Sequence, residues 1–399
     1  AIWHKKYARQ NDATWFSTSH DYVLVYGRNA DVWRPNRLPR TAEQNKGYKN
    51  VDNDPNGPWQ SVVYTCNKNA DERPNLYYPI TNPHTGQQVW PKRDRVWAFS
   101  EARHAENESV GKVWWGKNGE KAFPRQKVYL KDVDKGIVPD TLWTREDAGD
   151  NQDAVRTLTS LLGDNAEFSS PKPVKLIERM LALATHPDSD DVVLDFFAGS
   201  GTTGHAVYTK NQEDHGRRRF ILVQLPVRIE RTRFESIAAL TKARLRAAGE
   251  TIMGTDTEAV GLGFRAFKLA SSNIKPWDTD FEEVDEALLN AIDQVKSDRS
   301  NADVLYELLL KYGLDLAIGI DERSIAGKTV FIIGAGALVV CLDIDIDLDV
   351  VKGIAALKDE LQPSVMRVVF RDAGFANDVV KTNTVQILKQ AGVDDVKSL

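Results

Sequence analysis

The residues best suited to chemistry lie between Asp195 and Gly204, where a carboxylate is followed by glycines and small hydroxyl side chains. The glycines allow a tight turn and let the backbone come close to a bound group. The hydroxyls of Ser200, Thr202 and Thr203 can donate or accept hydrogen bonds within the same loop. A strand end of this composition, leading into a helix, predicts a binding site for a small ligand.

Two cofactor classes fit the glycine spacing. Gly199, Gly201 and Gly204 satisfy the dinucleotide fingerprint, in which an acidic residue about 20 positions further on holds the ribose. Here the next expected strand ends in Gln224 without a carboxylate, and Asp195 stands directly before the loop. This arrangement favours a ligand with an amine or cationic group and no pyrophosphate, such as S-adenosylmethionine. A nicotinamide or flavin nucleotide, and a purely structural loop, remain open at this point.

The elements that would position this loop lie on both sides of it. Val192 to Leu194 follow a polar run, which predicts a strand covered on both faces in the middle of a parallel sheet. A helix from Thr202 and a strand over Phe220 to Gln224 would complete one βαβ unit. Upstream, a helix over 174–184 follows Pro171-Lys172-Pro173, with Ser170 available as its cap. Together these patterns predict an α/β fold.

Composition divides the chain into three parts. Residues 1–150 carry 23 basic and 19 acidic side chains and nine of the ten tryptophans, residues 151–280 carry 17 of each sign, and residues 281–399 carry 12 basic and 21 acidic side chains. A nucleic-acid partner would meet the first part and avoid the last. The small basic excess is equally compatible with no such role.

Further elements are expected at the two ends of the chain. Tyr22 to Tyr26 predicts a core strand. Arg231 to Gly249 predicts a helix whose arginines are expected on a solvated face, with DNA contact as the alternative. The last part contains an expected acidic helix over Glu282 to Val295, a second helix over Leu305 to Tyr312, and strands over 329–333, 338–342 and 367–370. Gly334 to Gly336 predicts a hairpin turn.

Aromatic and basic residues alternate within the loop-rich segment 28–149. In the run 90–97 and in the pair 114–115, rings that can stack on bases adjoin cations that can hold phosphates. Enzymes that modify a base take it out of the stack, and aromatic walls help to hold it. DNA contact is therefore predicted for Trp90, Lys92, Arg93, Arg95, Trp97, Trp114 and Trp115. The alternative is a small β domain that uses tryptophan as its core.

Composition also argues against several classes of protein. The chain is 42% hydrophobic and 27% charged, no apolar run approaches the roughly 18 residues of a membrane span, and the N-terminus does not resemble a signal peptide. The only cysteines, Cys66 and Cys341, favour a reducing, cytoplasmic location and argue against structural zinc. The run Asp343 to Asp349 lacks the glycine and glutamate of a calcium loop and predicts an edge strand or helix lead-in.

Seven stretches taken together carry a family resemblance: His20 to Tyr26, Asn53 to Trp59, the Pro171-Lys172-Pro173 helix, Asp195 to Gly204, Phe220 to Pro226, Phe370 to Asp378 and Lys381 to Asn383. In combination, they resemble the modification subunit of type III restriction-modification systems, an adenine-N6 DNA methyltransferase of the β group. The resemblance spans nearly the whole chain. It implies a Rossmann-like S-adenosylmethionine-dependent α/β sheet, an inserted loop-rich aromatic target-recognition region and a C-terminal α+β domain.

The resemblance also implies which residues bind the cofactor. They are Lys172, Pro173, Asp195, Phe196, Gly199, Ser200, Gly201, Thr202, Thr203 and Gln224, with Lys172 expected to approach the cofactor carboxylate. Two positions depart from the family pattern. Gln224 stands where many relatives use a carboxylate for the ribose, and Val227 stands where glutamate is expected.

The family's catalytic motif, Asp-Pro-Pro-Tyr or a near variant, is absent from the 399 residues. Asp54-Pro55-Asn56 lacks the second proline and the aromatic residue. We therefore expect no catalytic residue in this chain, a native N-terminal part before Ala1, and no methylation by this polypeptide alone. The mechanism implied for the complete family member is in-line methyl transfer to N6 of a flipped-out adenine.

Four parts and several partners are expected from the resemblance. Residues 1–30 would supply strands of the catalytic half, 31–150 the target-recognition region, 151–270 the cofactor half, and 281–399 an acidic domain for dimerisation or docking. The expected partners are double-stranded DNA, a restriction subunit and a second copy of the chain, with no membrane. A non-catalytic DNA-binding or assembly subunit is the competing interpretation, and a nucleotide-dependent oxidoreductase is the third.

Overall fold

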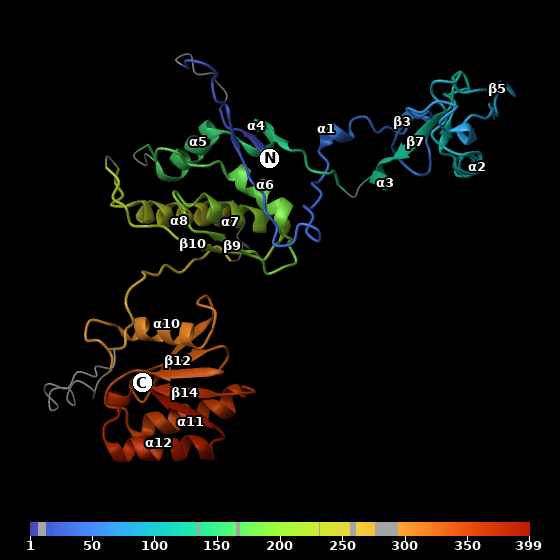
Figure 1. Cartoon of the computed structure of the whole chain (residues 1–399). Helices are drawn as coiled ribbons and strands as arrows, with labels where there is room; N and C mark the ends of the chain where they lie inside the picture. The colour runs from blue at the N-terminus through green and yellow to red at the C-terminus, as the bar shows by residue number, and fades with distance from the viewer. Residues whose placement is uncertain (7–12, 134–135, 165–167, 231, 256–260, 276–293) are drawn as a thin grey trace. The chain divides into compact units, whose positions relative to one another are not determined.

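The computed structural model describes residues 1–6, 13–133, 136–164, 168–230, 232–255, 261–275 and 294–399 (Figure 1). They form two compact units, Ala1–Gly263 and Phe264–Leu399. The division therefore lies before the expected boundary near residue 281, which falls outside the described residues. Most of the acidic helix expected over Glu282 to Val295 also lies outside them.

A three-stranded sheet lies at the N-terminus of the first unit. Strand β1 (Ile2–His4) pairs antiparallel with β2 (His20–Tyr22) and parallel with β8 (Leu142–Trp143). Trp3 is buried between these strands and α6 (Val174–Ala184), and its indole N–H donates to the Gly149 carbonyl at 2.9 Å. The prediction of a core strand over Tyr22 to Tyr26 is wrong. The strand ends at Tyr22, Val23 still exchanges two hydrogen bonds with Ala1, and the side chains of Tyr22, Leu24 and Tyr26 are exposed.

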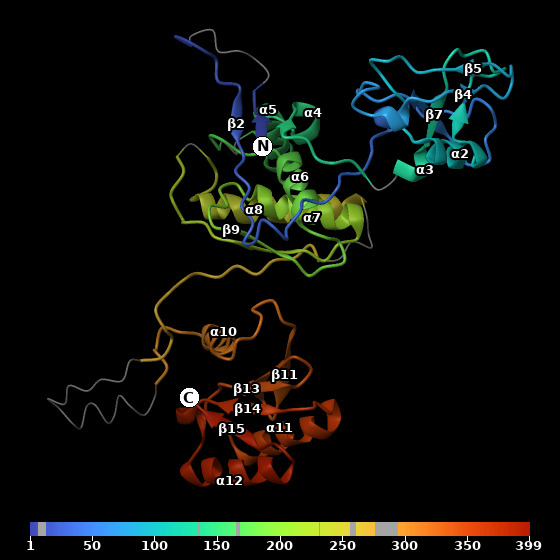
Figure 2. The same ribbon diagram turned by 45° about the vertical axis from the view of Figure 1, so that its right-hand side comes forward.

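The aromatic region folds around short antiparallel pairs (Figure 2). Strand β7 (Arg125–Tyr129) lies between β3 (Trp59–Val63) and β6 (Val113–Trp114), and β4 (Ile80–Thr81) pairs with β5 (Gln88–Val89). Its helices are α1 (Ala42–Asn45), the 3₁₀ turn η1 (Pro74–Leu76), α2 (Glu101–Ser109) and α3 (Leu130–Val133). Tyr64, Tyr78, Ile80, Trp97 and Trp115 form the core.

The C-terminal part of the first unit contains a two-stranded parallel sheet with helices on one face. Strands β9 (Val192–Asp195) and β10 (Arg219–Leu222) are joined by α7 (Thr202–Asp214), as the βαβ pattern predicted. Helices α4 (Arg145–Ala148), α5 (Asn151–Leu162), α6 and α8 (Ile237–Thr255) complete it. Helix α7 packs against α6 and α8, and the two long helices α7 and α8 lie side by side in Figures 1 and 2.

The prediction that β9 is covered on both faces is wrong. Val193 and Phe220 pack against α6 and α7, but Val192, Leu194 and Ile221 are 50%, 58% and 54% exposed. Successive side chains of a strand point to opposite faces, and within the described residues only one face of this sheet has helices packed on it. The opposite face of the pair is apolar and accessible to solvent.

The second unit is built on a five-stranded sheet in the order β11-β12-β13-β14-β15. Its strands are β11 (Ile320–Ile325), β12 (Lys328–Ile333), β13 (Leu338–Cys341), β14 (Arg367–Phe370) and β15 (Asp395–Ser398). The first three are antiparallel, with the predicted hairpin turn at Gly334–Gly336, and the last three are parallel. Helix α11 (Leu348–Leu361) connects β13 to β14. The 3₁₀ turn η2 (Asp372–Gly374) and helix α12 (Asp378–Gln390) connect β14 to β15.

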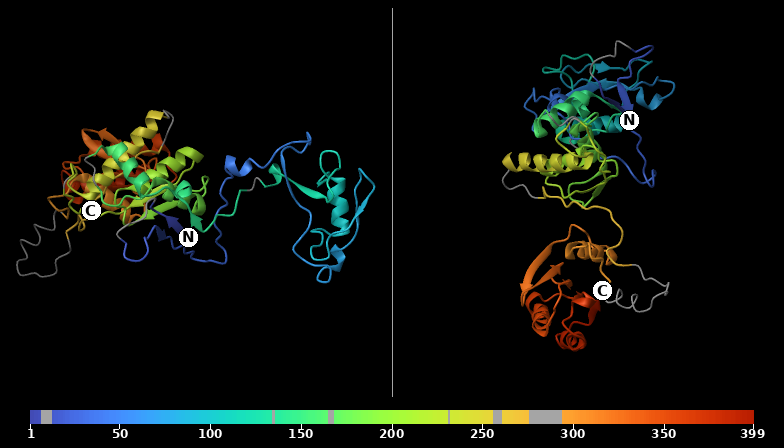
Figure 3. Two further views of the ribbon diagram at one scale, coloured as in Figure 1. Left: turned by 90° about the horizontal axis from the view of Figure 1, so that it is seen from above. Right: turned by 90° about the vertical axis from the view of Figure 1, so that its left-hand side faces the viewer.

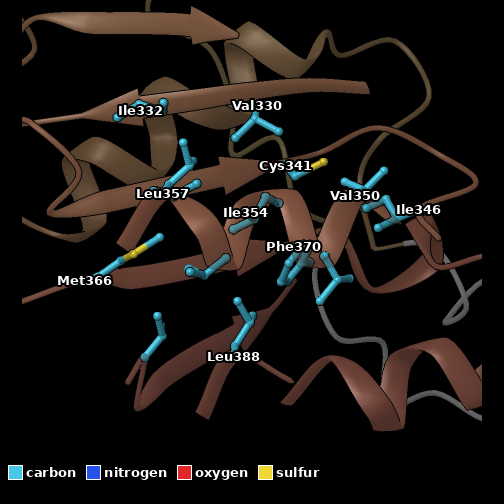
Figure 4. Close-up of a cluster of buried hydrophobic side chains, with 14 residues drawn as sticks. Val330, Ile332, Cys341, Ile346, Val350, Ile354, Leu357, Met366, Phe370 and Leu388 are labelled. Atoms are coloured by element: carbon cyan, nitrogen blue, oxygen red, sulfur yellow. The ribbon is translucent and has the colours of Figure 1, made fainter. Parts of the chain in front are cut away.

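Helices cover both faces of this second sheet (Figures 1 and 3). Side chains of α11 and α12 meet one face in a buried cluster that includes Ile354, Leu388 and Phe370 (Figure 4). Helix α10 (Asn301–Lys311) covers the other face through Leu305 and Leu309. The unit therefore has a sandwiched sheet with two hydrophobic cores.

The aspartate run 343–349 leads into helix α11. Asp347 caps α11 through the amides of Asp349 and Val350, so the run is a helix lead-in, as predicted.

No cluster of potential metal ligands and no helix able to cross a membrane occurs in the described ranges. Cys66 is half-buried, whereas Cys341 is fully buried, and burial raises the pKa of its thiol to about 11.

Candidate cofactor site and DNA-contact region

Asp195 fixes the loop that follows β9. One carboxylate oxygen accepts a hydrogen bond from the Phe197 amide at 3.0 Å, and the other accepts from the Thr203 hydroxyl at 2.6 Å. Its main-chain oxygen accepts from the Val223 amide at 2.8 Å. A single residue at the strand end therefore connects the start of the loop, the first turn of α7 and the segment after β10.

Gly199 and Gly201 adopt backbone conformations that favour glycine, with φ of +53° and +81°. A Cβ on Gly201 would lie 3.0 Å from the Thr241 methyl and 3.3 Å from the Thr241 carbonyl oxygen. Gly204 serves packing instead, because a Cβ there would approach a Leu245 methyl to 2.6 Å. The first two glycines therefore shape the loop, and the third lets α7 and α8 approach each other.

The first turn of α7 presents free backbone donors. Gly201 is its N-cap and supplies no side-chain acceptor. Among the described residues, the amides of Thr202, Thr203 and Gly204 donate to no protein acceptor. These N–H groups carry the positive end of the helix dipole, so they fit an anionic group such as the carboxylate of an amino-acid moiety. The donor set therefore fits S-adenosylmethionine, whose methionine part carries both a carboxylate and an amine.

Helix α8 supports the loop from behind through two residues that sequence reasoning missed. The Thr241 hydroxyl donates to the Gly199 carbonyl at 2.6 Å. One Arg244 nitrogen, Nη1, donates to the hydroxyl oxygens of Ser200 and Thr202, each at 2.8 Å. The arginines of this helix were expected on a solvated face, but Arg244 is fully buried. The spacing of Leu240, Thr241, Arg244 and Leu245 on one helix face was the available signal.

Arg244 is a buried cation without an acidic partner in the described part of the chain. Its Nε and Nη2 have no hydrogen-bond acceptor, and burial lowers the pKa of the guanidinium to about 10. Burial, with a contribution from the charge of Arg244, lowers the pKa of His205 to about 4. At pH 7 Arg244 is therefore charged and His205 neutral. The positive charge of Arg244 next to the loop favours an anionic group on the ligand.

The remaining predicted cofactor residues are placed unevenly. Gln224 accepts from the Gly199 amide at 2.7 Å, so its side chain orders the loop. Lys172 meets the loop through its carbonyl, which accepts from the Thr202 hydroxyl at 3.2 Å, while its ammonium lies 5.7 Å from the Trp3 ring centre. Pro173 is the N-cap of α6 in place of the expected Ser170. Phe196 is 61% exposed and contacts the Phe197 ring.

Comparison with known protein families agrees with this geometry. The family model described as DNA methylase, for N6 and N4 methyltransferases, matches residues 1–225, which is more than half of the chain. The chain belongs to the DNA methylase family. The matched range includes the N-terminal strands, the aromatic region, the loop 195–204 and Gln224.

Curated relatives give the same picture at moderate identity. The chain is 30% identical over 280 residues to the type III restriction-modification enzyme StyLTI Mod subunit of Salmonella typhimurium strain LT2, covering 68% of this chain and 41% of that protein. It is 28% identical to the EcoPI Mod subunit of Escherichia phage P1, covering 63% and 42%. It is 29% identical to the type II methyltransferase M.KpnI of Klebsiella pneumoniae, covering 57% of each. The chain spans about half the length of these relatives.

The predicted DNA-contact residues separate into buried and accessible groups. Trp97 and Trp115 are buried in the aromatic core, so they offer no ring face for stacking and the prediction is wrong for both. The interleaving of aromatic and basic residues does not reveal which rings turn inward. Trp90 is 49% exposed and contacts the Tyr77 ring. Trp114 is partly exposed, with the Lys121 ammonium 5.4 Å from its ring centre.

The three predicted cations of this region are all exposed. Arg93 lies 3.6 Å from the Asp71 carboxylate and over the Tyr77 ring. Lys92 and Arg95 have no acidic partner among the described residues, and Arg95 donates to the Thr65 hydroxyl at 2.8 Å. DNA contact by these side chains stays a prediction.

Proposed function

We propose that this methylase binds S-adenosylmethionine at the loop 195–204 and supplies the cofactor half and the DNA-reading region of an adenine-N6 DNA methyltransferase of a type III restriction-modification system. The observation that carries the proposal is the loop itself. Asp195, Gln224, Thr241 and Arg244 fix it from different elements, and the first three amides of α7 have no protein acceptor among the described residues. The names of two relatives, which are Mod subunits of type III restriction-modification enzymes, support the assignment to such a system.

The chain's own groups would bind and orient the cofactor. The α7 amides would hold the carboxylate of the methionine moiety, with the positive charge of Arg244 behind them. The remaining lone pairs of the Asp195 carboxylate would accept from the cofactor's amine. Bound S-adenosylmethionine supplies a methyl group on a sulfonium centre. Asp195 and the α7 amides would together fix the direction in which that methyl group points.

Transfer requires groups that this sequence does not contain. An adenine N6 that attacks the methyl in line needs acceptors for its amino hydrogens and an aromatic surface for its ring. The 399 residues include no Asp-Pro-Pro-Tyr motif or near variant. We therefore expect this polypeptide to bind the cofactor without methylating DNA, because the groups that would hold a flipped-out adenine are missing.

Ligand-dependent thermal shift tests the cofactor assignment. S-adenosylmethionine should raise the melting temperature of the first unit, whereas NAD should not. Gly201→Val should abolish the response, because the side chain would meet Thr241 at a positive φ. Gly313→Val, also at a positive φ but in open space in the second unit, is the matched control. Stabilisation by NAD alone would favour the oxidoreductase, and no response to either would contradict the proposal.

Transfer of a labelled methyl group to DNA tests the inactivity. Incubation of the purified chain with labelled S-adenosylmethionine and unmethylated duplex should give incorporation at the level of the Gly201→Val variant. Clear turnover would contradict the requirement for the absent motif and leave the cofactor assignment intact.

We further propose that the acidic second unit, Phe264–Leu399, docks protein rather than DNA. Residues 281–399 carry an excess of nine acidic side chains, which repels phosphates and suits a restriction subunit or a second copy of the chain. Light scattering of the isolated unit measures its mass directly. A dimer would support self-association, and a monomer would leave the restriction subunit as the proposed partner.

A further inference from the structure

A pocket of about 410 Å³ opens at the surface of the aromatic region, where β3 ends and β7 begins. We define the basic pocket by six of its lining residues: Val63, Lys92, Arg95, Lys121, Phe123 and Arg125. Three separate segments supply them: the end of β3, the turn after β5, and the approach to β7. The fold thus brings four cations from two distant parts of the sequence to one wall.

The four cations of the basic pocket lack salt bridges within the described residues, although the Glu120 carboxylate interacts electrostatically with the adjacent Lys121. No carboxylate within the described residues forms an ion pair with Lys92, Arg95, Lys121 or Arg125. Some other cations of the same region do form ion pairs. Arg103 pairs with Glu106 on α2, Lys112 with Asp132 at 3.1 Å, and Lys127 with Asp52 and Asp54 at 2.5 and 2.6 Å. Four cations without a salt bridge among the described residues therefore meet at this one pocket.

Both arginines are held in place but keep free donors. The Arg95 Nε donates to the Thr65 hydroxyl at 2.8 Å, and neither of its terminal nitrogens has a protein acceptor in the described part of the chain. Arg125 uses Nε and Nη2 on Ser61, which leaves Nη1. A guanidinium anchored in this way presents donors of fixed direction, as recognition of a phosphate or of a guanine edge requires.

The floor of the basic pocket is apolar. Phe123 is 42% exposed, and its ring meets the buried Trp97 ring edge-on with centroids 6.2 Å apart. Val63 beside it is 53% exposed. Trp97, which cannot contact DNA itself, therefore holds in place a ring that can. An apolar surface ringed by cations fits a nucleobase between phosphates better than an acidic peptide, which would leave Phe123 and Val63 unused.

We propose that the basic pocket is a specificity-determining contact of the methylase with duplex DNA: its four cations neutralise backbone phosphates and Phe123 meets a base edge. This deepens the proposed function and rests on it for the identity of the DNA partner. The inference replaces the buried Trp97 and Trp115 by Lys121, Phe123 and Arg125 as contact residues.

Salt-dependent binding tests the phosphate contacts. The probe is a fluorescein-labelled 30-base-pair duplex of random sequence, titrated with the full chain between 50 and 200 mM NaCl. The double variant Arg95→Ala/Lys121→Ala should bind about tenfold more weakly, and the slope of log affinity against log salt should fall by about two. Arg103→Ala removes a charge that Glu106 already balances, and should stay within about twofold of wild type. Melting temperatures verify that the variants fold.

Equal losses in Arg103→Ala and in the pocket variants, or an unchanged slope, would overturn the inference. Selection of bound duplexes from a random library tests Phe123. Phe123→Ala should keep the salt slope and lose preference at one base position, whereas an unchanged preference would overturn the base contact. If a polyglutamate peptide binds the pocket and the duplex does not, the partner is an acidic protein and the inference fails.

This test is separate from that of the proposed cofactor role. Normal stabilisation by S-adenosylmethionine without DNA binding would overturn the pocket inference alone. Pocket-dependent DNA binding without a cofactor response would support the pocket and contradict the cofactor assignment.

Discussion

Two strands of similar sequence have opposite environments in this chain. Val-Val-Leu-Asp forms β9 in the first unit, and Leu-Val-Val-Cys forms β13 in the second. All four residues of β13 are buried, whereas Val192 and Leu194 of β9 are exposed to about half of their surface or more. In β13, Val339 faces the cluster of α11 and α12, and Val340 faces the cluster of α10.

The difference shows that an apolar sequence indicates that a strand can be buried, but does not reveal whether other elements pack on both of its faces. Covering an apolar side chain contributes about 25 cal/mol per Å² of surface removed from water. The second unit gains this on both faces of its sheet. The β9–β10 pair gains it on one, so its outer face would be stabilised by any further strand or helix that covered it.

The largest expected effect comes from placing a charge in each strand. Val339→Asp should unfold the second unit. An unpaired carboxylate buried between the sheet and its covering helices lowers the free energy of unfolding by more than about 4 kcal/mol. Leu194→Asp should cost less than about 1 kcal/mol, because its carboxylate would stay in water. Hydrogen exchange read by mass spectrometry follows each unit separately. Comparable loss of protection in both variants would show that the β9 face is covered in solution.

The second largest expected effect is that acidification destabilises the first unit more than the second. Since the folded-state pKa of His205, about 4, lies below the unfolded value of about 6.5, the unfolded chain takes up the proton first. The contribution of neutral His205 to the free energy of unfolding is therefore fully present above pH 6.5. It is lost as the pH falls toward 4, which lowers the free energy of unfolding by roughly 3 kcal/mol. Burial also lowers the pKa of His104, so this histidine too destabilises the first unit as the pH falls.

The second unit contains no histidine and provides the internal control. Urea unfolding at pH 7 and pH 5, read by hydrogen exchange, should show the first unit weakening more. His205→Gln should reduce the difference, and a difference that the substitution leaves unchanged would contradict the assignment to His205.

The smallest effect concerns one hydroxyl in each unit. Thr241→Val removes the hydrogen bond to the Gly199 carbonyl and should weaken S-adenosylmethionine binding about fivefold, equivalent to about 1 kcal/mol. Thr384→Val is the matched control, because the buried Thr384 hydroxyl bonds only to the Val380 carbonyl of its own helix among the described residues. Isothermal titration calorimetry measures both. Equal affinities for the two variants would show that the loop does not need support from α8.

The local parts of the cofactor site were predictable from sequence. The glycines and the strand end at Asp195 predicted the loop, and the apolar face of residues 174–184 predicted α6, because these signals lie within one element. Thr241 and Arg244 were not predictable in the same way, since their role depends on the approach of α8 to α7. That approach in turn depends on Gly204 and Leu245, which lie far apart in the sequence.

Burial was the property that the sequence predicted least well. Trp97 and Trp114 have the same residue type and similar basic neighbours, yet one is core and the other is partly exposed. Strand β1 was missed, because its three residues pair with strands that begin at His20 and Leu142. Edge strands β11 and β15 were missed as well, since charged residues interrupt their apolar patterns. Each of these outcomes is decided by partners distant in the chain.

The contrast between the two cysteines makes the unmodified chain suitable for spectroscopy. Cys341 lies inside β13 with a raised pKa, so it is protected from thiol reagents, while Cys66 is only half-buried. Cys66 directly follows Thr65, whose hydroxyl holds Arg95 at the basic pocket. A thiol-reactive fluorophore would therefore attach at a single position next to this pocket, and its emission would report the arrival of a ligand without any engineered residue.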